Sequence, residues 1–220
     1  MKLKEFKEIL KTGNYDKIKP LLRMEVRNKE TLRDCDFYFN IIGDIVKVIT
    51  AYAELDDYTQ VTTILPHSIV DKWLITQPSI LMDVMENTPS NFNLGRLFDI
   101  VHCRILDKNK TLEQYPLHKI KTLTDSNNPL DSIIVVNIDS STRVSILQFP
   151  NLLHSVYNKI GNYYIVPSSV YEVFIIPENK MPDIDHMNEL IEQVNKTTVE
   201  PEDVLGHKLL KYDNSGLSEC

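Results

Sequence analysis

Glycine and cysteine are both scarce in this chain. Only six of its 220 residues are glycine, and none of them forms a G-x-G pattern. A phosphate loop or a dinucleotide-binding turn needs closely spaced glycines so that the backbone can approach the ligand, and the sequence therefore argues against both. The three cysteines, Cys35, Cys103 and Cys220, are too few and too scattered for a disulfide framework or a zinc knuckle, so we expect reduced thiols.

Long apolar runs and an excess of positive charge are also missing. No run approaches the ~20 apolar residues that span a bilayer, and the N-terminal sequence MKLKEFKEIL has the pattern of an amphipathic helix without a signal-peptide core. The formal net charge of -7 argues against a nucleic-acid-binding surface, because phosphate binding draws on clustered lysine and arginine. These features predict a cytoplasmic protein with neither a membrane nor a nucleic acid as its partner.

Motifs of catalytic or metal chemistry are absent from the sequence as well. The chain contains no H-E-x-x-H, C-x-x-C or G-x-S-x-G pattern. A zinc site would have to be assembled by the fold from separated histidines, which are His67, His102, His118, His154, His186 and His207. A catalytic Ser168 or Ser169 would need a base from elsewhere, with His67 and His154 the nearest candidates. We therefore assign no catalytic residue, no metal ligand and no cofactor.

The most strand-like part of the sequence is residues 162–178, which holds two apolar runs, each closed by a proline. Residues 163–166 and 173–176 are aromatic and β-branched, and neither run alternates polar with apolar residues. Strands of that kind are buried on both faces, so we expect a central position in a covered sheet. The segment between the runs contains no glycine, and we expect one helical turn there with Ser168 as its N-cap.

Helical periodicity dominates the first thirty residues. Apolar residues recur at helical spacing over residues 2–11, and Gly13 stops that helix. The pattern resumes over residues 15–26, which predicts a second helix. Among the first thirty residues, those that we expect to face solvent are Arg23, Arg27 and Lys29. We divide the chain into an N-terminal helical segment at 1–30, a single α+β domain at 31–213 and a disordered tail at 214–220.

The later segments mix helices with paired strands. The β-branched runs at 41–53 and 59–65 predict one antiparallel hairpin, and those at 132–138 and 143–149 predict another. We expect helices at 66–73, with Trp73 packed against the sheet, after Thr76, at 92–106, from Pro150 to Gly161, and after Asp183. The polar stretch 107–128 is either a connection or a flap. This mixed order predicts an α+β fold, with an antiparallel or mixed sheet of about six strands and helices packed on its faces.

Several motifs occur in an order that resembles a known family. They are Leu-Pro-His at 65–67 with Trp73 after it, Glu-Asn-Thr-Pro at 86–89, the strand-turn-strand before Pro150, YIVPSSVYEV at 164–173 and VNKTTVEPEDVL at 194–205. Over residues 15–213 they are similar to the bacterial domain-of-unknown-function family 5688. Its members carry further N-terminal strands, so the chain resembles an N-terminally truncated member, and they more often have histidine where Tyr171 stands. The resemblance implies a bacterial, phage or mobile-element origin and no activity.

Two functions from different classes fit this sequence. A sound core, an acidic composition and the missing catalytic motifs favour a non-enzymatic protein that binds another protein, as an interaction module or an inhibitor. The alternative is a hydrolase-type enzyme or a small-ligand sensor with a pocket at residues 167–172. The candidate binding residues of that pocket are Ser168, Ser169, Tyr171, Glu172, Asn87 and Thr88.

Overall fold

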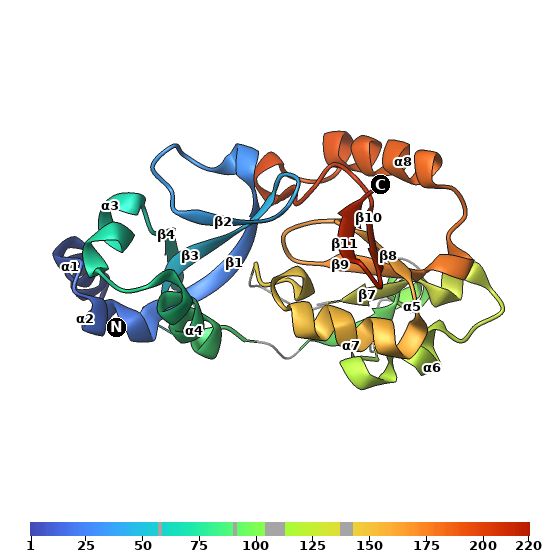
Figure 1. The fold of residues 1–220 in the computed structure, drawn as a ribbon, viewed down its shortest axis with the longest axis horizontal. Helices are drawn as coiled ribbons and strands as arrows, with labels where there is room; N and C mark the ends of the chain where they lie inside the picture. Colours follow the sequence, from blue (N-terminus) through green and yellow to red (C-terminus); the bar gives the residue numbers. More distant parts are fainter. Residues whose placement is uncertain (57–58, 90–91, 104–112, 137–142) are drawn as a thin grey trace.

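The structure is a computed structural model that describes the chain except for residues 57–58, 90–91, 104–112 and 137–142. Two antiparallel β-sheets lie towards opposite ends of an elongated molecule, and helices pack on both (Figure 1). The first sheet has four strands and is formed by the N-terminal part of the chain, whereas the second has seven. The expected α+β class is confirmed, although two sheets replace the single sheet of about six strands.

Strand β3 is the centre of the first sheet. The strands are β1 (Leu22–Asn28), β2 (Tyr38–Ile42), β3 (Ile45–Glu54) and β4 (Gln60–Ile64). β1 pairs with one side of β3, and β2 and β4 follow one another along the other side. The hairpin expected from residues 41–53 and 59–65 is confirmed as β3 and β4. A turn at Gly43 divides the first of those runs, and its φ of 52° is a conformation that glycine reaches without strain.

β1 corrects the helix that we expected over residues 15–26. Only Tyr15–Ile18 is α-helical (α2), a 3₁₀ turn covers Lys19–Leu21, and the strand then begins. Leu22 and Val26 lie four residues apart, a spacing that fits one face of a helix and also fits alternate positions of a strand. Pairing with β3 decides between the two, so residues 1–30 are not wholly helical.

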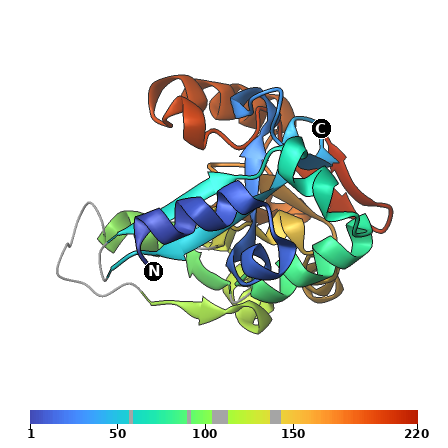
Figure 2. The ribbon, with the colours of Figure 1, turned by 90° about the vertical axis from the view of Figure 1, so that its left-hand side faces the viewer.

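Four helices cover one face of the first sheet. They are α1 (Leu3–Thr12), α2, α3 (His67–Val70) and α4 (Gln77–Asn87). Figure 2 shows α1, in dark blue, lying across the strands, and its Phe6 is buried in the same cluster as Ile49 of β3. Trp73 also belongs to this cluster, and its Nε1 donates to the Gly13 carbonyl at 2.9 Å. The expected packing of Trp73 is confirmed.

The second sheet is centred on β8 and β9. In chain order its strands are β5 (Asn93–Arg96), β6 (Tyr115–Pro116), β7 (Ile134–Val136), β8 (Tyr163–Val166), β9 (Val173–Pro177), β10 (Leu210–Asp213) and β11 (Gly216–Glu219). Their order in the sheet is β11-β10-β8-β9-β7-β5-β6. β8 and β9 pair with each other and are buried along almost their whole length, so their expected central position is confirmed.

Helices cover both faces of the second sheet. They are α5 (Leu97–Val101), α6 (Ile120–Thr124), α7 (Pro150–Ile160) and α8 (Ile184–Thr197). α6 and α7 pack on the face that carries Ile175, whereas α5 and α8 pack on the face that carries Phe174. As expected, Gly161 ends α7 and Asp183 caps α8, where its carboxylate accepts from the His186 N–H at 2.8 Å. Within the described residues, no helix is long and apolar enough to cross a membrane.

Two elements expected in the second half are replaced by others. Residues 92–106 are not one helix, because β5 comes first and α5 begins only at Leu97. Residues 143–149 do not pair with β7, which lies between β5 and β9. The apolar residues of that run, Val144, Ile146 and Leu147, are buried in the core instead. Ile146–Gln148 forms a 3₁₀ turn.

Two polar segments form more regular structure than we expected. Residues 214–220 are not a disordered tail, because β11 pairs with β10 and forms an edge of the second sheet. Of the stretch 107–128, residues 107–112 lie outside the described residues, and the part that follows contains β6, a 3₁₀ turn at Leu117–Lys119 and α6. Further 3₁₀ turns are Lys29–Thr31, Asp71–Trp73, Pro129–Ser132, Glu178–Lys180 and Pro201–Asp203.

The outer edge of β1 joins the two sheets. The Met24 N–H donates to the Thr88 hydroxyl at 2.8 Å, and the Val26 N–H donates to the Arg143 carbonyl at 2.7 Å. The Gln148 side chain donates to the Met24 carbonyl at 3.5 Å. An edge that would otherwise be open is therefore buried, and its backbone groups are satisfied by segments distant in the chain.

Candidate functional site

One face of the first sheet is polar. Successive residues of a strand point to opposite faces, so Leu22 and Met24 pack with the helices while Arg23, Glu25 and Arg27 share the other face. The same face continues across the sheet with Thr50, Tyr52 and Glu54 of β3 and with Gln60 and Thr62 of β4. The sheet thus has one apolar side for packing and one side that presents charged and hydrogen-bonding groups.

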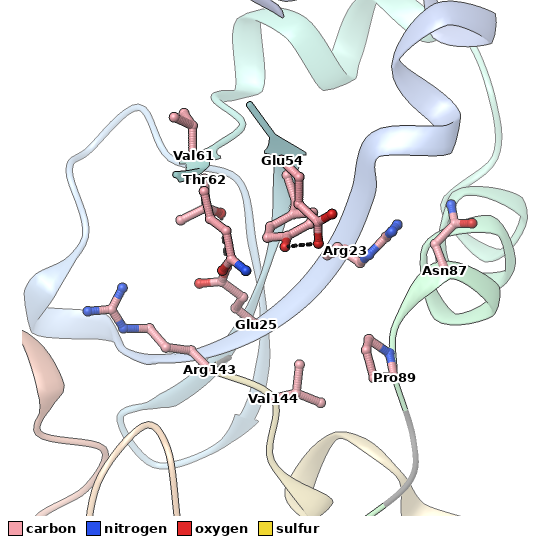
Figure 3. A pocket seen from close by; sticks show the side chains of 11 residues that line it. Arg23, Glu25, Glu54, Val61, Thr62, Asn87, Pro89, Arg143 and Val144 are labelled. Carbon is pink, nitrogen blue, oxygen red and sulfur yellow. Dashed lines mark hydrogen bonds between the residues drawn. The ribbon is translucent and has the colours of Figure 1, made fainter. Parts of the chain in front are cut away.

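A cavity of about 400 Å³ lies on this polar face (Figure 3). Its lining consists of Arg23, Glu25, Tyr52, Glu54, Gln60, Val61 and Thr62 of the first sheet, Asn87 and Pro89 at the end of α4, and Arg143 and Val144. We call this cavity the cleft. Its size falls in the range of ligand pockets, roughly 300–1,000 Å³, and it is lined by segments that come from distant parts of the chain.

Glu25 lies at the centre of the cleft, and both of its carboxylate oxygens are bonded. Oε2 pairs with Arg27 Nη2 at 2.7 Å, and Oε1 accepts from the hydroxyls of Thr62 at 3.0 Å and Thr50 at 3.3 Å. Glu25 and Arg27 are each 8% exposed. Burial lowers the pKa of Arg27, against the opposing effect of Glu25. The bonds hold the buried charges in fixed positions, so this part of the cleft is preorganised.

Arg23 lies on one side of Glu25. Its guanidinium carbon is 5.6 Å from the centre of the Tyr52 ring, and its Nη1 donates to the Leu22 carbonyl at 2.8 Å. The Tyr52 hydroxyl donates to the Glu54 carboxylate at 2.8 Å, and burial, reinforced by this bond, raises the pKa of Tyr52. In Figure 3 the guanidinium points towards Asn87. No carboxylate among the described residues forms an ion pair with Arg23, so its charge is available to a ligand.

Arg143 lies on the other side of Glu25. Its Nη2 bonds to Asp203 Oδ1 at 2.8 Å, and its guanidinium lies over the Tyr171 ring, 5.3 Å from the centre. Burial opposes the charge of Arg143, but Asp203 and Tyr171 outweigh it and raise the pKa of the guanidinium. Burial is also the main cause of the raised pKa of Tyr171. The Nε atoms of Arg143 and Arg27 are buried, and no described residue forms a hydrogen bond with them.

Asn87 and Tyr171 are the predicted site residues that lie closest to the cleft. Asn87 lines it, and its Nδ2 donates to the Lys19 carbonyl at 2.8 Å. Tyr171 supports the cleft from behind, because its ring packs on Arg143. Thr88 is 4% exposed, and its hydroxyl accepts from Met24 and donates to the Val84 carbonyl at 2.7 Å. Thr88 therefore joins β1 to α4 and offers nothing to a ligand.

Ser168, Ser169 and Glu172 lie in the connection between β8 and β9. That connection is not the expected helical turn, and Ser168 does not cap one. Ser169 Oγ accepts from the Tyr171 N–H at 3.2 Å, and the Ser169 N–H donates to the Glu172 carbonyl at 3.1 Å, so a local turn satisfies the backbone. Ser168 lines a separate apolar groove of about 150 Å³ beside α8. The structure does not bring the six predicted residues into one pocket.

Sequence reasoning missed Arg23, Glu25 and Arg143 as site residues. The signal for the first two is the strict alternation of apolar and charged residues in β1, which is typical of a strand with one polar face. Our expectation that Arg27 faces solvent is wrong, because it is buried against Glu25. The local sequence of Arg143 contains no comparable signal, since only the tertiary fold places it beside β1.

A second groove in the described residues is a weaker candidate for a binding site. A groove of about 650 Å³ lies between α8 and the turn at Lys29–Thr31, where His207 Nε2 is 3.8 Å from a Glu30 carboxylate oxygen. Both side chains are largely exposed, so solvent screens their interaction. No group of three or more His, Cys, Asp or Glu in the described part of the chain is placed to hold a metal ion. The cleft, with its buried ion pair, is the better-built site.

The fold and the cleft define a class of protein: an α+β protein of two antiparallel sheets with a polar cleft on the smaller one. The chain belongs to the family of unknown function DUF5688, whose family model matches residues 2–214. The match agrees with the resemblance of its motifs. No curated protein and no solved structure matches the chain. The geometry of the cleft is therefore the feature of this chain that bears on its function.

Proposed function

We propose that this chain is a non-enzymatic binding protein whose partner is another protein, and that the cleft is its recognition site. The observation that supports this proposal is Arg23, a half-buried guanidinium in the cleft that forms no ion pair with the described residues. The Tyr52 ring and the Leu22 carbonyl hold it in place, which reduces the side-chain entropy lost on binding. An acidic group of a partner can form a charge-assisted hydrogen bond with it.

The rest of the cleft fits recognition better than catalysis. Glu25 uses both carboxylate oxygens in internal bonds, and Arg143 is bonded to Asp203, so these groups shape the cleft. On the rim, the side-chain amide of Gln60 can orient a bound segment, whereas the Thr62 hydroxyl donates to Glu25. The hydrolase alternative is less favoured, because the hydroxyl of Ser169 is engaged by a backbone N–H and that of Ser168 is beside the apolar groove.

Photo-crosslinking in cells of the source organism tests the proposal. A benzophenone amino acid is placed at Gln60, which is exposed on the rim, and at Glu8, which is exposed on α1 as a matched control. We expect one dominant protein adduct from position 60, none from position 8, and loss of the adduct when Arg23→Gln is added. Equal labelling from both positions, or an adduct that survives Arg23→Gln, would contradict the proposal.

A small-ligand sensor is the second candidate. The observation in its favour is the volume of the cleft, about 400 Å³, which is enough for a small molecule. Native mass spectrometry of the protein purified from its own cells separates the two functions. A bound small molecule that is released by Arg23→Gln, with no protein adduct at position 60, would support the sensor and exclude protein recognition at the cleft.

A further inference from the structure

Among the described strands, none covers the outer edge of β4, which lies beside the cleft. The Leu55 N–H donates to the Thr59 carbonyl at 2.9 Å, and the Leu65 N–H donates to the Ile49 carbonyl at 2.9 Å. In an antiparallel pair, hydrogen-bonded positions alternate along each strand. The peptide N–H and C=O groups of Val61 and Thr63 therefore point toward β3. The peptide N–H and C=O groups of the alternate residues, which are Gln60, Thr62 and Ile64, therefore point away from the sheet.

No strand among the described residues pairs with this outer edge, since β4 pairs only with β3. The neighbouring segment Cys35–Phe37 bonds to residues 65–67, beyond the end of β4. Natural edge strands are usually protected by lysine, proline, bulges or a covering segment. The sequence QVTTI of β4 has no charged residue and no proline, and four of its five residues are β-branched.

The edge of the second sheet differs in this respect. β11 begins with Gly216, and Glu219 lies near its end. A Cβ on Gly43, in the turn between β2 and β3, would overlap the Glu219 carboxylate, so the turn of the first sheet closely covers this edge. β4 is thus less protected than β11, although it is short.

The open edge is continuous with the cleft. Gln60 and Thr62, whose peptide groups point outward, also direct their side chains to the cleft lining. A strand added to β4 would place alternate side chains above the same face. Arg23 lies three strands away from an added strand, about 14 Å. Its guanidinium lies over Tyr52 of β3, and β3 is two strands from the added strand, so the gap that a partner's side chain must cross is about 10 Å.

We propose that β4 binds an extended segment of the partner protein as an additional β-strand, and that this segment carries a glutamate that reaches Arg23 through the cleft. Main-chain hydrogen bonds to the peptide groups of Thr62 and Ile64 hold the segment, and the cleft selects its side chains. Glutamate is favoured over aspartate because the gap to Arg23 requires the longer side chain. The proposal rests on the proposed function, since it needs a protein partner.

A display library of short linear peptides tests the proposal with the purified protein. Thr62→Pro removes the outward N–H, a change that an edge strand tolerates. Thr63→Val is the matched control on the same strand, because the peptide groups of Thr63 point toward β3 and Thr63 does not line the cleft. We expect enriched peptides with a glutamate at a fixed position, at least about tenfold weaker binding to Thr62→Pro, and binding within about twofold for Thr63→Val. Arg23→Gln should remove the selection for glutamate.

Hydrogen exchange gives a second readout that does not depend on the folding of Thr62→Pro. An enriched peptide should slow exchange at the amides of Thr62 and Ile64 in the unmodified protein. Peptides that bind Thr62→Pro undiminished, unchanged exchange at those amides, self-association of the protein through β4, or no enrichment would each overturn the proposal. A partner that crosslinks at Gln60 yet binds Thr62→Pro normally would exclude strand addition to β4. The proposed function, protein recognition at the cleft, would not be affected by that result.

Discussion

At the scale of single residues, Glu25 and Arg27 form the buried charge pair of the first sheet. Removing one partner of such a pair leaves the other charge buried and uncompensated. We predict that Glu25→Ala lowers the free energy of unfolding by about 3 kcal/mol. Urea denaturation followed by the fluorescence of Trp73, which is buried in the same sheet's core, measures the loss.

The control for this prediction removes both charges. The double variant Glu25→Leu with Arg27→Met replaces the ion pair by apolar groups of similar size, which is often neutral or stabilising. We expect the double variant to be more stable than Glu25→Ala. Equal losses in the two proteins would show that packing, rather than the uncompensated guanidinium, sets the cost.

Protonation of Asp36 should lower the stability of the protein in acid. Burial alone would raise its pKa, but hydrogen bonds from Arg33 outweigh burial and hold the pKa below its ordinary value of 3.8. The contacts include Arg33 Nη2 at 2.7 Å and the Arg33 N–H at 3.0 Å. The unfolded state therefore takes up this proton at a higher pH than the folded state does.

The stability from Asp36 should be complete above the pKa of the unfolded state and decline as pH falls through the lower pKa of the folded state. We predict that the free energy of unfolding of the native protein decreases between pH 5 and pH 3 more than that of Asp36→Asn, which cannot titrate. Urea denaturation at the two pH values gives the comparison. Parallel declines in both proteins would rule out a contribution from Asp36.

At the scale of elements, the helices with sharp boundaries could be predicted from the sequence. Gly13 and Gly161 each end a helix with a positive φ, and Asp183 begins one as its N-cap. β8 and β9 were equally predictable, because a run without polar residues needs burial on both faces. These features depend on the local sequence alone.

The N-cap of α8 gives a prediction at this scale. Asp183 accepts from the His186 N–H at 2.8 Å, and replacing such a cap by alanine costs about 1 kcal/mol. We predict that loss for Asp183→Ala in thermal or urea denaturation. Asp185→Ala is the matched control, since Asp185 lies in the first turn without that bond and should cost only a few tenths of a kcal/mol. A larger loss from Asp185→Ala would contradict the capping role.

Strand β1 shows why the rest of the fold and the cleft could not be predicted in the same way. Leu22 and Val26 fit two periods, and charged residues at alternate positions usually mean solvent exposure. Glu25 is buried instead, because hydrogen bonds from Thr50 and Thr62, which are distant in the sequence, satisfy its carboxylate. Arg143 reaches the cleft only through the fold of the second half, so no local pattern indicates it. The cleft is formed by tertiary contacts, and the local sequence indicates only the alternation of apolar and charged residues in β1.

At the scale of the whole molecule, the outer edge of β1 is held by bonds from the end of α4 and from residues 143 and 148 of the second half. Thr88→Val would leave the buried N–H of Met24 without an acceptor, which costs about 1–3 kcal/mol. We predict a loss in that range from urea denaturation. Thr124→Val is the matched control. Thr124 is also a buried threonine that donates to the carbonyl four residues earlier, at 3.0 Å, but it accepts no bond from any other segment that the structure describes.

The control should lose less than Thr88→Val. Both variants remove a hydroxyl that bonds back to its own helix, so the difference between them isolates the bond to β1. Equal losses would indicate that this joint contributes little to the stability of the folded chain.

The joint also has a consequence for the growing polypeptide. Gln148, one of the groups that bond the outer edge of β1, lies 124 residues after Met24. At ~5–20 residues per second, the ribosome needs about ten seconds to make that interval. The strands of the first sheet are thus complete long before residues 143 and 148 can cover the outer edge of β1, and part of that edge stays exposed in the nascent chain during this interval. Premature pairing of this edge between neighbouring nascent chains is the hazard that this architecture must avoid during synthesis.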